Sequence, residues 1–176
     1  MKNLVFILIG CVMLWACSQP KPEAAPAETK PAPVEFGEQK YIDISKQSVQ
    51  SLAAGDVDAF VSTLSDDDRF NWNYGDSING KAAISDYWKE RRGNVIDTLI
   101  ISNDVWLTVK ANEEPAPGIR TGTWVFGWYT ATAKYKATGK SMTQLIHQVQ
   151  HFNSDGKIDE VTQFLDRALI QAALKK

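Results

Sequence analysis

The sequence predicts an α+β domain in which a strongly curved antiparallel sheet wraps round N-terminal helices. Three observations predict it. Apolar residues recur at helical spacing over 41–64, apolar and polar side chains alternate over much of 95–165, and short glycine-containing turns interrupt the second region. Helices followed by antiparallel strands are typical of the α+β class, and one bent sheet must cover the helices to bury their apolar sides.

The first helical region divides at a glycine. Residues 41–54 predict one helix, and Gly55 suits its C-terminal end because glycine adopts the left-handed conformation found there. Asp56 is then placed to cap a second, short helix over 57–64. The acidic run over 66–68 is expected to form a solvated turn.

The rest of the domain is predicted as one further helix among strands. The expected elements are a strand over 70–74, a helix over 81–92, and strands over 98–101, 105–109, 121–135, 142–152 and 158–165. Asn103 and Asp104 separate the first two strands of the later run. A loop over 113–118 contains two prolines.

The N-terminus has the features of an export signal over residues 1–16. Lys2 supplies a positive charge, and the apolar run after it is shorter than the ~20 residues of a membrane-spanning helix. Leu14-Trp15-Ala16-Cys17 resembles the lipobox of bacterial lipoproteins, in which the cysteine is acylated after cleavage directly before it. We expect the lipid on Cys17, and prefer it to Cys11 because the apolar segment before Cys11 is short.

These features divide the chain into a signal peptide (1–16), a lipid-anchored Pro/Ala-rich tether (17–37) and one domain (38–176). We therefore expect a protein of the cell envelope whose membrane partner is bound through the lipid on Cys17. Ser18 resembles the outer-membrane sorting pattern of some bacteria.

Composition excludes several kinds of site in the mature domain. Both cysteines lie at or before the lipidation position, which leaves no disulfide, thiolate metal site or cysteine nucleophile. Loss of Lys2 moves the formal charge from −2 to −3, and no basic block is present, so nucleic acid is not an expected partner.

Three local features together resemble the nuclear transport factor 2-like (SnoaL-like) superfamily over residues 41–169. They are the helix break Ala53-Ala54-Gly55-Asp56, the segment Ile78-Asn79-Gly80-Lys81 leading into Ile84-Ser85-Asp86-Tyr87-Trp88, and Asp155-Gly156-Lys157-Ile158 running into Phe164-Leu165-Asp166. The resemblance implies a cone-shaped, cystatin-like roll with a pocket at its open end. Members include isomerases, cyclases, dehydratases and epoxide hydrolases as well as binding modules, so the fold leaves the function open.

The pocket is expected to be aromatic, with amide groups as its polar part. Period-two alternation places Trp124, Phe126 and Trp128 on one face of a strand. Aromatic walls with few polar groups suit a flat or apolar ligand. The candidate pocket residues are Trp72, Tyr74, Trp88, Trp106, Trp124, Trp128, Gln148, Gln150 and Gln163.

The two histidines, His147 and His151, are the first candidates for acid–base chemistry. Four residues apart on a strand, they lie about 13 Å from each other, too far to share one zinc ion. Asp76 is the best remaining carboxylate near the open end. Asp166 matches the terminal aspartate of the family, which more often anchors the strand end than reacts. We expect no metal and no other cofactor.

The residue at position 163 favours binding over catalysis. The epoxide-hydrolase branch of the family places an acid where this chain has Gln163, and an amide does not act as a general base at neutral pH. We therefore expect a non-catalytic domain that binds a small, largely apolar ligand. The alternatives are an isomerase, dehydratase or hydrolase that uses His147, His151 or Asp76 for proton transfer, and a homodimer that pairs through the sheet as relatives often do.

Overall fold

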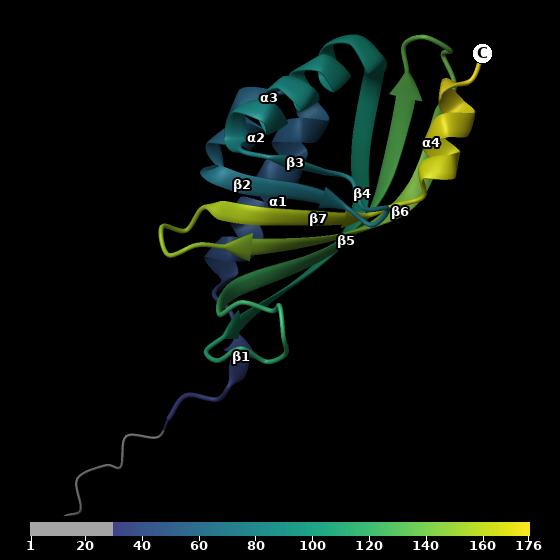
Figure 1. The fold of residues 1–176 in the computed structure, drawn as a ribbon. Helices are drawn as coiled ribbons and strands as arrows, with labels where there is room; N and C mark the ends of the chain where they lie inside the picture. Colours follow the sequence, from purple (N-terminus) through teal and green to yellow (C-terminus); the bar gives the residue numbers. More distant parts are fainter. Residues whose placement is uncertain (1–29) are drawn as a thin grey trace, which may run out of the picture. The chain divides into compact units, whose positions relative to one another are not determined.

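The computed structural model describes residues 30–176, so the predicted signal peptide, Cys17 and most of the predicted tether lie outside the described residues. The elements are β1 (Val34–Phe36), α1 (Gln39–Ala54), α2 (Val57–Ser62), β2 (Leu64–Trp72), β3 (Ser77–Asn79), α3 (Lys81–Glu90), a π-helical turn η1 (Arg91–Val95), β4 (Ile96–Ala111), β5 (Gly122–Tyr135), β6 (Ser141–Phe152), β7 (Ile158–Phe164) and α4 (Arg167–Leu174) (Figure 1). Within the described part of the chain, no helix has the length and apolar character needed to cross a membrane.

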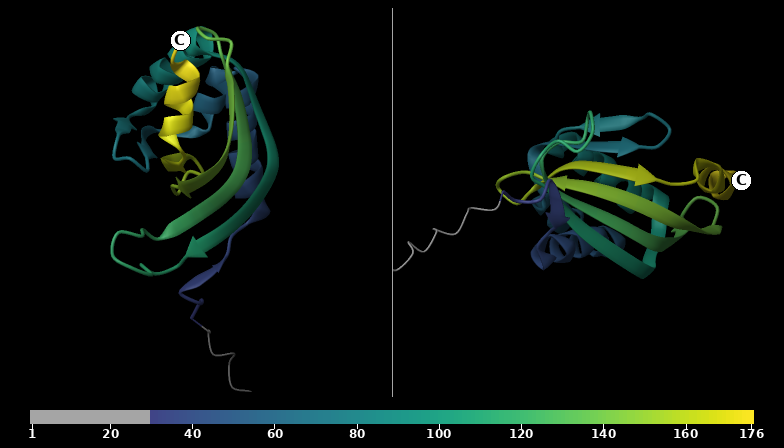
Figure 2. Two further views of the ribbon diagram at one scale, coloured as in Figure 1. Left: turned by 90° about the vertical axis from the view of Figure 1, so that its right-hand side faces the viewer. Right: turned by 90° about the horizontal axis from the view of Figure 1, so that it is seen from below.

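One seven-stranded sheet in the order β1-β4-β5-β6-β7-β2-β3 forms the domain. The long strands β4, β5 and β6 bend strongly, and α1, α2 and α3 lie on the concave side (Figure 2). Every pair is antiparallel except β2 and β7, which run parallel. The predicted fold class is confirmed, with a mixed sheet because this one parallel pair brings the end of the chain back beside β2.

The helix boundaries follow from local signals. Gly55 ends α1 with a φ of 88°, in the left-handed region that favours glycine. The Asp56 carboxylate accepts the backbone N–H of Ala59 at 2.9 Å and begins α2. Both assignments agree with the prediction, because each depends on residues adjacent in sequence.

The core fills the space between the helices and the concave face of the sheet. Its largest cluster joins α2 and α3 to β2 and β7 through Phe60, Ile84, Phe70 and Val161, all of them almost fully buried. At ~25 cal/mol per Å² of apolar surface, burial of such side chains stabilises the fold by roughly 2–3 kcal/mol each.

The acidic run 66–68 is not a turn, which corrects the prediction. It lies inside β2, where a register shift against β7 between Leu64 and Arg69 interrupts the regular alternation, so that Asp66 is exposed and Asp68 is fully buried. Backbone pairing of the flanking residues decides this outcome, Leu64 with β7 and Arg69 with both β7 and β3, because three consecutive acids carry no strand signal of their own.

Three other boundaries differ from the prediction. The two strands predicted around Asn103 and Asp104 form the single strand β4, interrupted by a bulge at which Asn103 adopts a φ of 53°. Val34–Phe36, at the end of the predicted tether, pairs with β4 as β1. The C-terminal helix α4 has no counterpart in the prediction.

Candidate functional site

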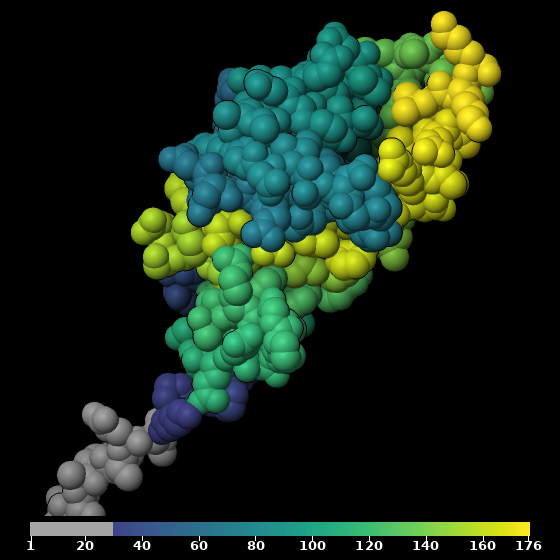
Figure 3. Space-filling view, in the orientation of Figure 1, coloured from purple at the N-terminus to yellow at the C-terminus, as the bar shows by residue number. Residues whose placement is uncertain are grey.

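A cavity of about 590 Å³ lies between the concave face of β4, β5 and β6 and the helices α3 and α4. The surface is recessed where the teal residues of α3 approach the yellow residues of α4 (Figure 3). Most of its lining is apolar, including Phe70, Trp72, Leu99 and Ile146. Its size falls within the ~300–1,000 Å³ of small-molecule sites.

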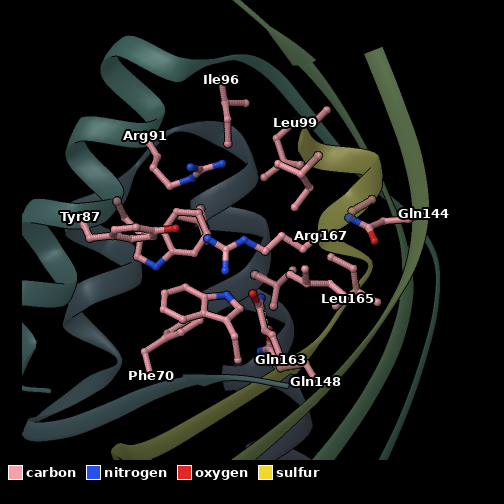
Figure 4. Close-up of a pocket in the computed structure, with 18 of the residues that line it drawn as sticks. Phe70, Tyr87, Arg91, Ile96, Leu99, Gln144, Gln148, Gln163, Leu165 and Arg167 are labelled. Carbon is pink, nitrogen blue, oxygen red and sulfur yellow. Dashed lines mark hydrogen bonds between the residues drawn. The ribbon is translucent and has the colours of Figure 1, made fainter. Parts of the chain in front are cut away.

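Three neutral polar side chains form a hydrogen-bonded group in the cavity wall. Gln148 Oε1 accepts the Tyr129 hydroxyl at 2.9 Å and the Gln163 amide at 2.8 Å (Figure 4). Burial raises the pKa of the Tyr129 hydroxyl well above its ordinary value, so this group stays protonated. The group therefore offers hydrogen bonds without a charge.

Charged side chains border the cavity where α3 ends and α4 begins. Arg91 and Arg167 reach into the space from opposite sides (Figure 4). Asp76 lies 3.5 Å from the Arg167 guanidinium, and 65 % of its side chain is exposed. It is the one carboxylate among the described residues that line the cavity.

The first turn of α4 is held in place by polar contacts. Gln144 Oε1 accepts the backbone N–H of Asp166 at 2.7 Å. The Asp166 carboxylate accepts the N–H of Ala168 at 2.8 Å and caps the helix. Asn73, in the turn after β2, contributes a side-chain amide that donates to the Leu165 carbonyl. These bonds fix the position from which Arg167 enters the cavity, and they give Asp166 a capping role.

Six of the residues predicted for the site line this cavity. They are Trp72, Tyr74, Trp88, Gln148, Gln163 and Asp76. Trp72 and Tyr74 stack with ring planes 9° apart, and Arg167 lies 4.5 Å above the Tyr74 ring. The aromatic wall thus comes from β2 and α3.

Trp124 and Trp128, which the sequence places in the pocket, lie instead on the outer face of the sheet. Trp128 stacks on His147 at 4.7 Å, and Trp124 lies 4.6 Å from His151. The reason is Gly127, whose inner side is covered by Trp106: a Cβ at Gly127 would come within 2.4 Å of that ring. With Gly127 facing inward, its two neighbours face outward.

Trp106 and Gln150 also lie outside the cavity lining. Trp106 packs into the core, stacks on Tyr129 at 5.9 Å and donates its indole N–H to Asp104. Gln150 is 1 % exposed, and neither atom of its amide has a hydrogen-bond partner within residues 30–176.

The two histidines face away from the cavity. His147 contacts the carbonyl of Gly127 at 3.0 Å. His151 is buried, with Nδ1 2.5 Å from the Asp159 carboxylate and Nε2 3.0 Å from the Thr121 carbonyl. Their outward position removes both from the list of groups that could transfer a proton inside the cavity.

An ion network surrounds His151 on that outer side. Arg120 donates to both Asp159 and Glu160 at 3.0 Å. Although burial raises the pKa of Asp159, hydrogen bonds from His151 and Arg120 more than offset it and lower the pKa overall. Nowhere in residues 30–176 do three or more His, Cys, Asp or Glu side chains gather as a metal site.

Tyr129, Arg91 and Arg167 are site residues that sequence reasoning missed. Tyr129 could have been found by strand alternation, because it must face inward if Trp128 faces outward. The arginines carried no such signal: Arg91 lies at the end of a predicted helix and Arg167 starts a helix that was not predicted. Only the approach of α3 to α4 brings them to one cavity.

The SnoaL-like domain family matches residues 46–161, so the chain belongs to this family. This confirms the resemblance read from the three local features. A search of curated proteins gives no match.

Solved structures share the fold at low identity. A protein of Xanthomonas campestris provisionally named a polyketide cyclase is 19 % identical over 78 % of this chain and 98 % of its own, with a TM-score of 0.62. An NTF2-like protein of unknown function from Burkholderia pseudomallei is 14 % identical over 79 % and 100 %, with a TM-score of 0.62. An epoxide hydrolase of M. tuberculosis is 15 % identical over 77 % and 90 %, with a TM-score of 0.56. Members of this fold are often isomerases, cyclases or hydrolases, and others bind ligands.

Proposed function

We propose that the domain binds a small, largely apolar ligand in the cavity and does not catalyse a reaction on it. The observation that carries this proposal is the neutral group of Gln148, Gln163 and Tyr129, whose members bind one another. General acid–base catalysis needs a group that changes protonation near the working pH, and these three do not.

A pair of matched substitutions on β5 tests the cavity. Ala131 lines the cavity, whereas the next residue toward the N-terminus, Thr130, faces the other side of the sheet. Ala131→Phe should fill the space and weaken binding of the neutral fluorescent probe N-phenyl-1-naphthylamine by at least tenfold. Thr130→Phe should leave its affinity unchanged. Equal effects of both substitutions, or no binding by the wild-type chain, would refute the proposal.

The alternative function is an enzyme that uses Asp76 for proton transfer. It has one observation in its favour, because Asp76 is the carboxylate that lines the cavity. Its high exposure and its ion pair with Arg167 favour a role in holding that arginine at the cavity edge over proton transfer. Turnover of an epoxide or a cyclic ketone that Asp76→Asn abolishes would establish the enzyme instead.

We also propose that the chain is held at the cell envelope, at the outer membrane, through a lipid on Cys17. The support is the sequence Leu14-Trp15-Ala16-Cys17 and the proline-rich segment that follows it. Metabolic labelling with a palmitate analogue should be lost in Cys17→Ser and kept in Cys11→Ser. The reverse pattern would assign the lipid to Cys11.

Finally, we propose that two copies pair through the outer face of the sheet. The strand register aligns Val105, Trp128, His147 and Phe164 in one row across four strands. Three of them are large apolar side chains with at least a third of their surface exposed, as is Leu145 nearby. Contiguous apolar surface of this kind marks interaction sites. Sedimentation should show a dimer that Leu145→Glu converts to monomer; a wild-type monomer at micromolar concentration would refute it.

A further inference from the structure

Arg91 and Arg167 are two cations at the edge of a mostly apolar cavity. Arg91 directly follows α3, and Arg167 is the first residue of α4. Both side chains extend toward the centre of the cavity from opposite walls (Figure 4). The structure thus directs two positive charges toward the same space.

The charges of the lining do not balance. Two arginines and one aspartate leave one positive charge, and Asp76 contacts Arg167 alone. No ion pair within residues 30–176 joins Arg91 to a carboxylate; its guanidinium instead lies 5.6 Å above the Tyr87 ring. Arg91 is therefore a cation whose counter-charge the described protein does not supply.

The neighbour of Arg91 shows that the local backbone does not require this arrangement. Arg92 turns the other way and donates to the carbonyls of Ala53 and Ile96, which connects η1 to α1 and β4. The Arg91 side chain donates no such hydrogen bond to a backbone carbonyl among the described residues. Two like charges beside an apolar space repel each other, and an anion between them would remove that cost.

We propose that the ligand is an amphipathic monocarboxylate whose apolar body lies against Phe70, Trp72 and Leu99 and whose carboxylate binds Arg91 and Arg167. This inference rests on the proposed function and specifies the chemical class of the ligand. A planar guanidinium donates two parallel hydrogen bonds to a carboxylate, which a hydroxyl or an amide cannot accept in the same way. The neutral amides of Gln148 and Gln163 then face the body of the ligand and do not compete for its charge.

A matched pair of ligands tests this inference by calorimetry on the full chain. Dodecanoate and dodecan-1-ol have the same alkyl chain and differ in the charged group. We expect dodecanoate to bind at least tenfold more tightly. Arg91→Gln and Arg167→Gln should each remove most of this ratio, whereas Arg91→Lys should retain part of it because the charge remains.

Arg69→Gln is the matched control, since Arg69 is an exposed arginine of β2 that does not line the cavity. It should leave the ratio unchanged. Binding of N-phenyl-1-naphthylamine by the Arg91→Gln and Arg167→Gln chains shows that the cavity is intact in each variant.

The outcomes separate the two proposals. If dodecan-1-ol binds as tightly as dodecanoate while the neutral probe still binds, the carboxylate inference is wrong and the apolar binding site stands. If Arg69→Gln reduces the ratio as much as Arg91→Gln does, the preference is a general charge effect and the inference is also wrong. If neither dodecyl compound nor the probe binds, both proposals fail.

Discussion

Two carboxyl groups on neighbouring strands, the partly buried Asp159 on β7 and the fully buried Asp68 on β2, end with pKa values shifted in opposite directions although burial raises both. Asp159 contacts His151 and Arg120, and these hydrogen bonds lower its pKa although burial opposes them. No side chain among the described residues binds either oxygen of Asp68, and burial, opposed only by the backbone N–H of Arg69, raises its pKa to about 7. Burial alone therefore does not decide the charge of a carboxyl group; its partners do.

The two faces of the sheet differ in the same way, since charged side chains have charged partners on the outer face and the inner face is mostly uncharged. The outer face carries a network in which Arg120 binds both Asp159 and Glu160, and His151 contacts Asp159. The inner face carries amides and hydroxyls, apart from Asp68 and the rim of the cavity. Variants that remove one group from each environment test how far this contrast determines stability.

Asp68→Asn should have the largest effect on stability. Well below pH 3.8 the carboxyl is neutral in both states; as the pH rises to about 7, the unfolded chain ionises first and the free energy of unfolding falls. A rise from 3.8 to about 7 corresponds to about 4 kcal/mol at about 1.4 kcal/mol per pKa unit. Urea unfolding should show Asp68→Asn gaining up to this amount at pH 8 and almost nothing at pH 4.

Asp66→Asn is the control for this measurement, because Asp66 lies two residues away with its side chain 99 % exposed. It should change stability little at either pH. A gain for Asp68→Asn that is the same at pH 4 and pH 8 would show that ionisation of Asp68 is not the cause.

Asp159→Asn should have the opposite sign and a smaller size. It removes the negative charge beside His151 and Arg120 and replaces one of the two acceptor oxygens by an NH2 group, and hydrogen bonds of charged groups contribute ~2 kcal/mol each before screening by solvent. Because the folded pKa is lowered, this stability is present above about pH 4 and is lost as the pH falls through the folded pKa. Thermal unfolding at pH 7 should show a loss of ~2 kcal/mol. The control Asp97→Asn on β4 removes only a half-exposed ion pair with Lys134 and should show almost no loss.

Gln150→Met and Gln163→Met compare an unpaired amide with a paired one on the inner face. Gln150 lacks partners within residues 30–176, so an apolar side chain of similar length should raise stability by ~1 kcal/mol. Gln163→Met removes the donor to Gln148 and should lower stability by a similar amount. Chemical denaturation midpoints measure both. Shifts of the same sign would show that pairing of these amides does not control stability.

Much of the fold could be predicted because its signals are local. Gly55 and Asp56 mark a helix end and a helix start through bonds to residues within five positions. Asp68 could not be placed in this way: an acidic triplet predicts a solvated turn, and pairing with a strand from the far end of the chain overrides it. The helix α4 was missed because it depends on contacts such as that between Gln144 and Asp166.

The candidate site also has a part that local sequence signals predicted and a part that they did not. Alternation along a strand shows that Trp124 and Trp128 share a face, but not which face the cavity lies on. That choice depends on the packing of Trp106 over Gly127, a contact between two strands. The aromatic part of the wall on β2 and α3 was predicted, and the pair of arginines was not.

By itself the sequence determined the α+β class, the order of the principal elements and the family, because helix caps, glycine turns and residue periodicity act over a few positions. Tertiary structure alone decided which side chains enter the cavity, and why the pKa of Asp159 is lowered while that of Asp68 is raised. Both depend on groups far apart in the chain, whose distance and burial are set only when the sheet closes round the helices.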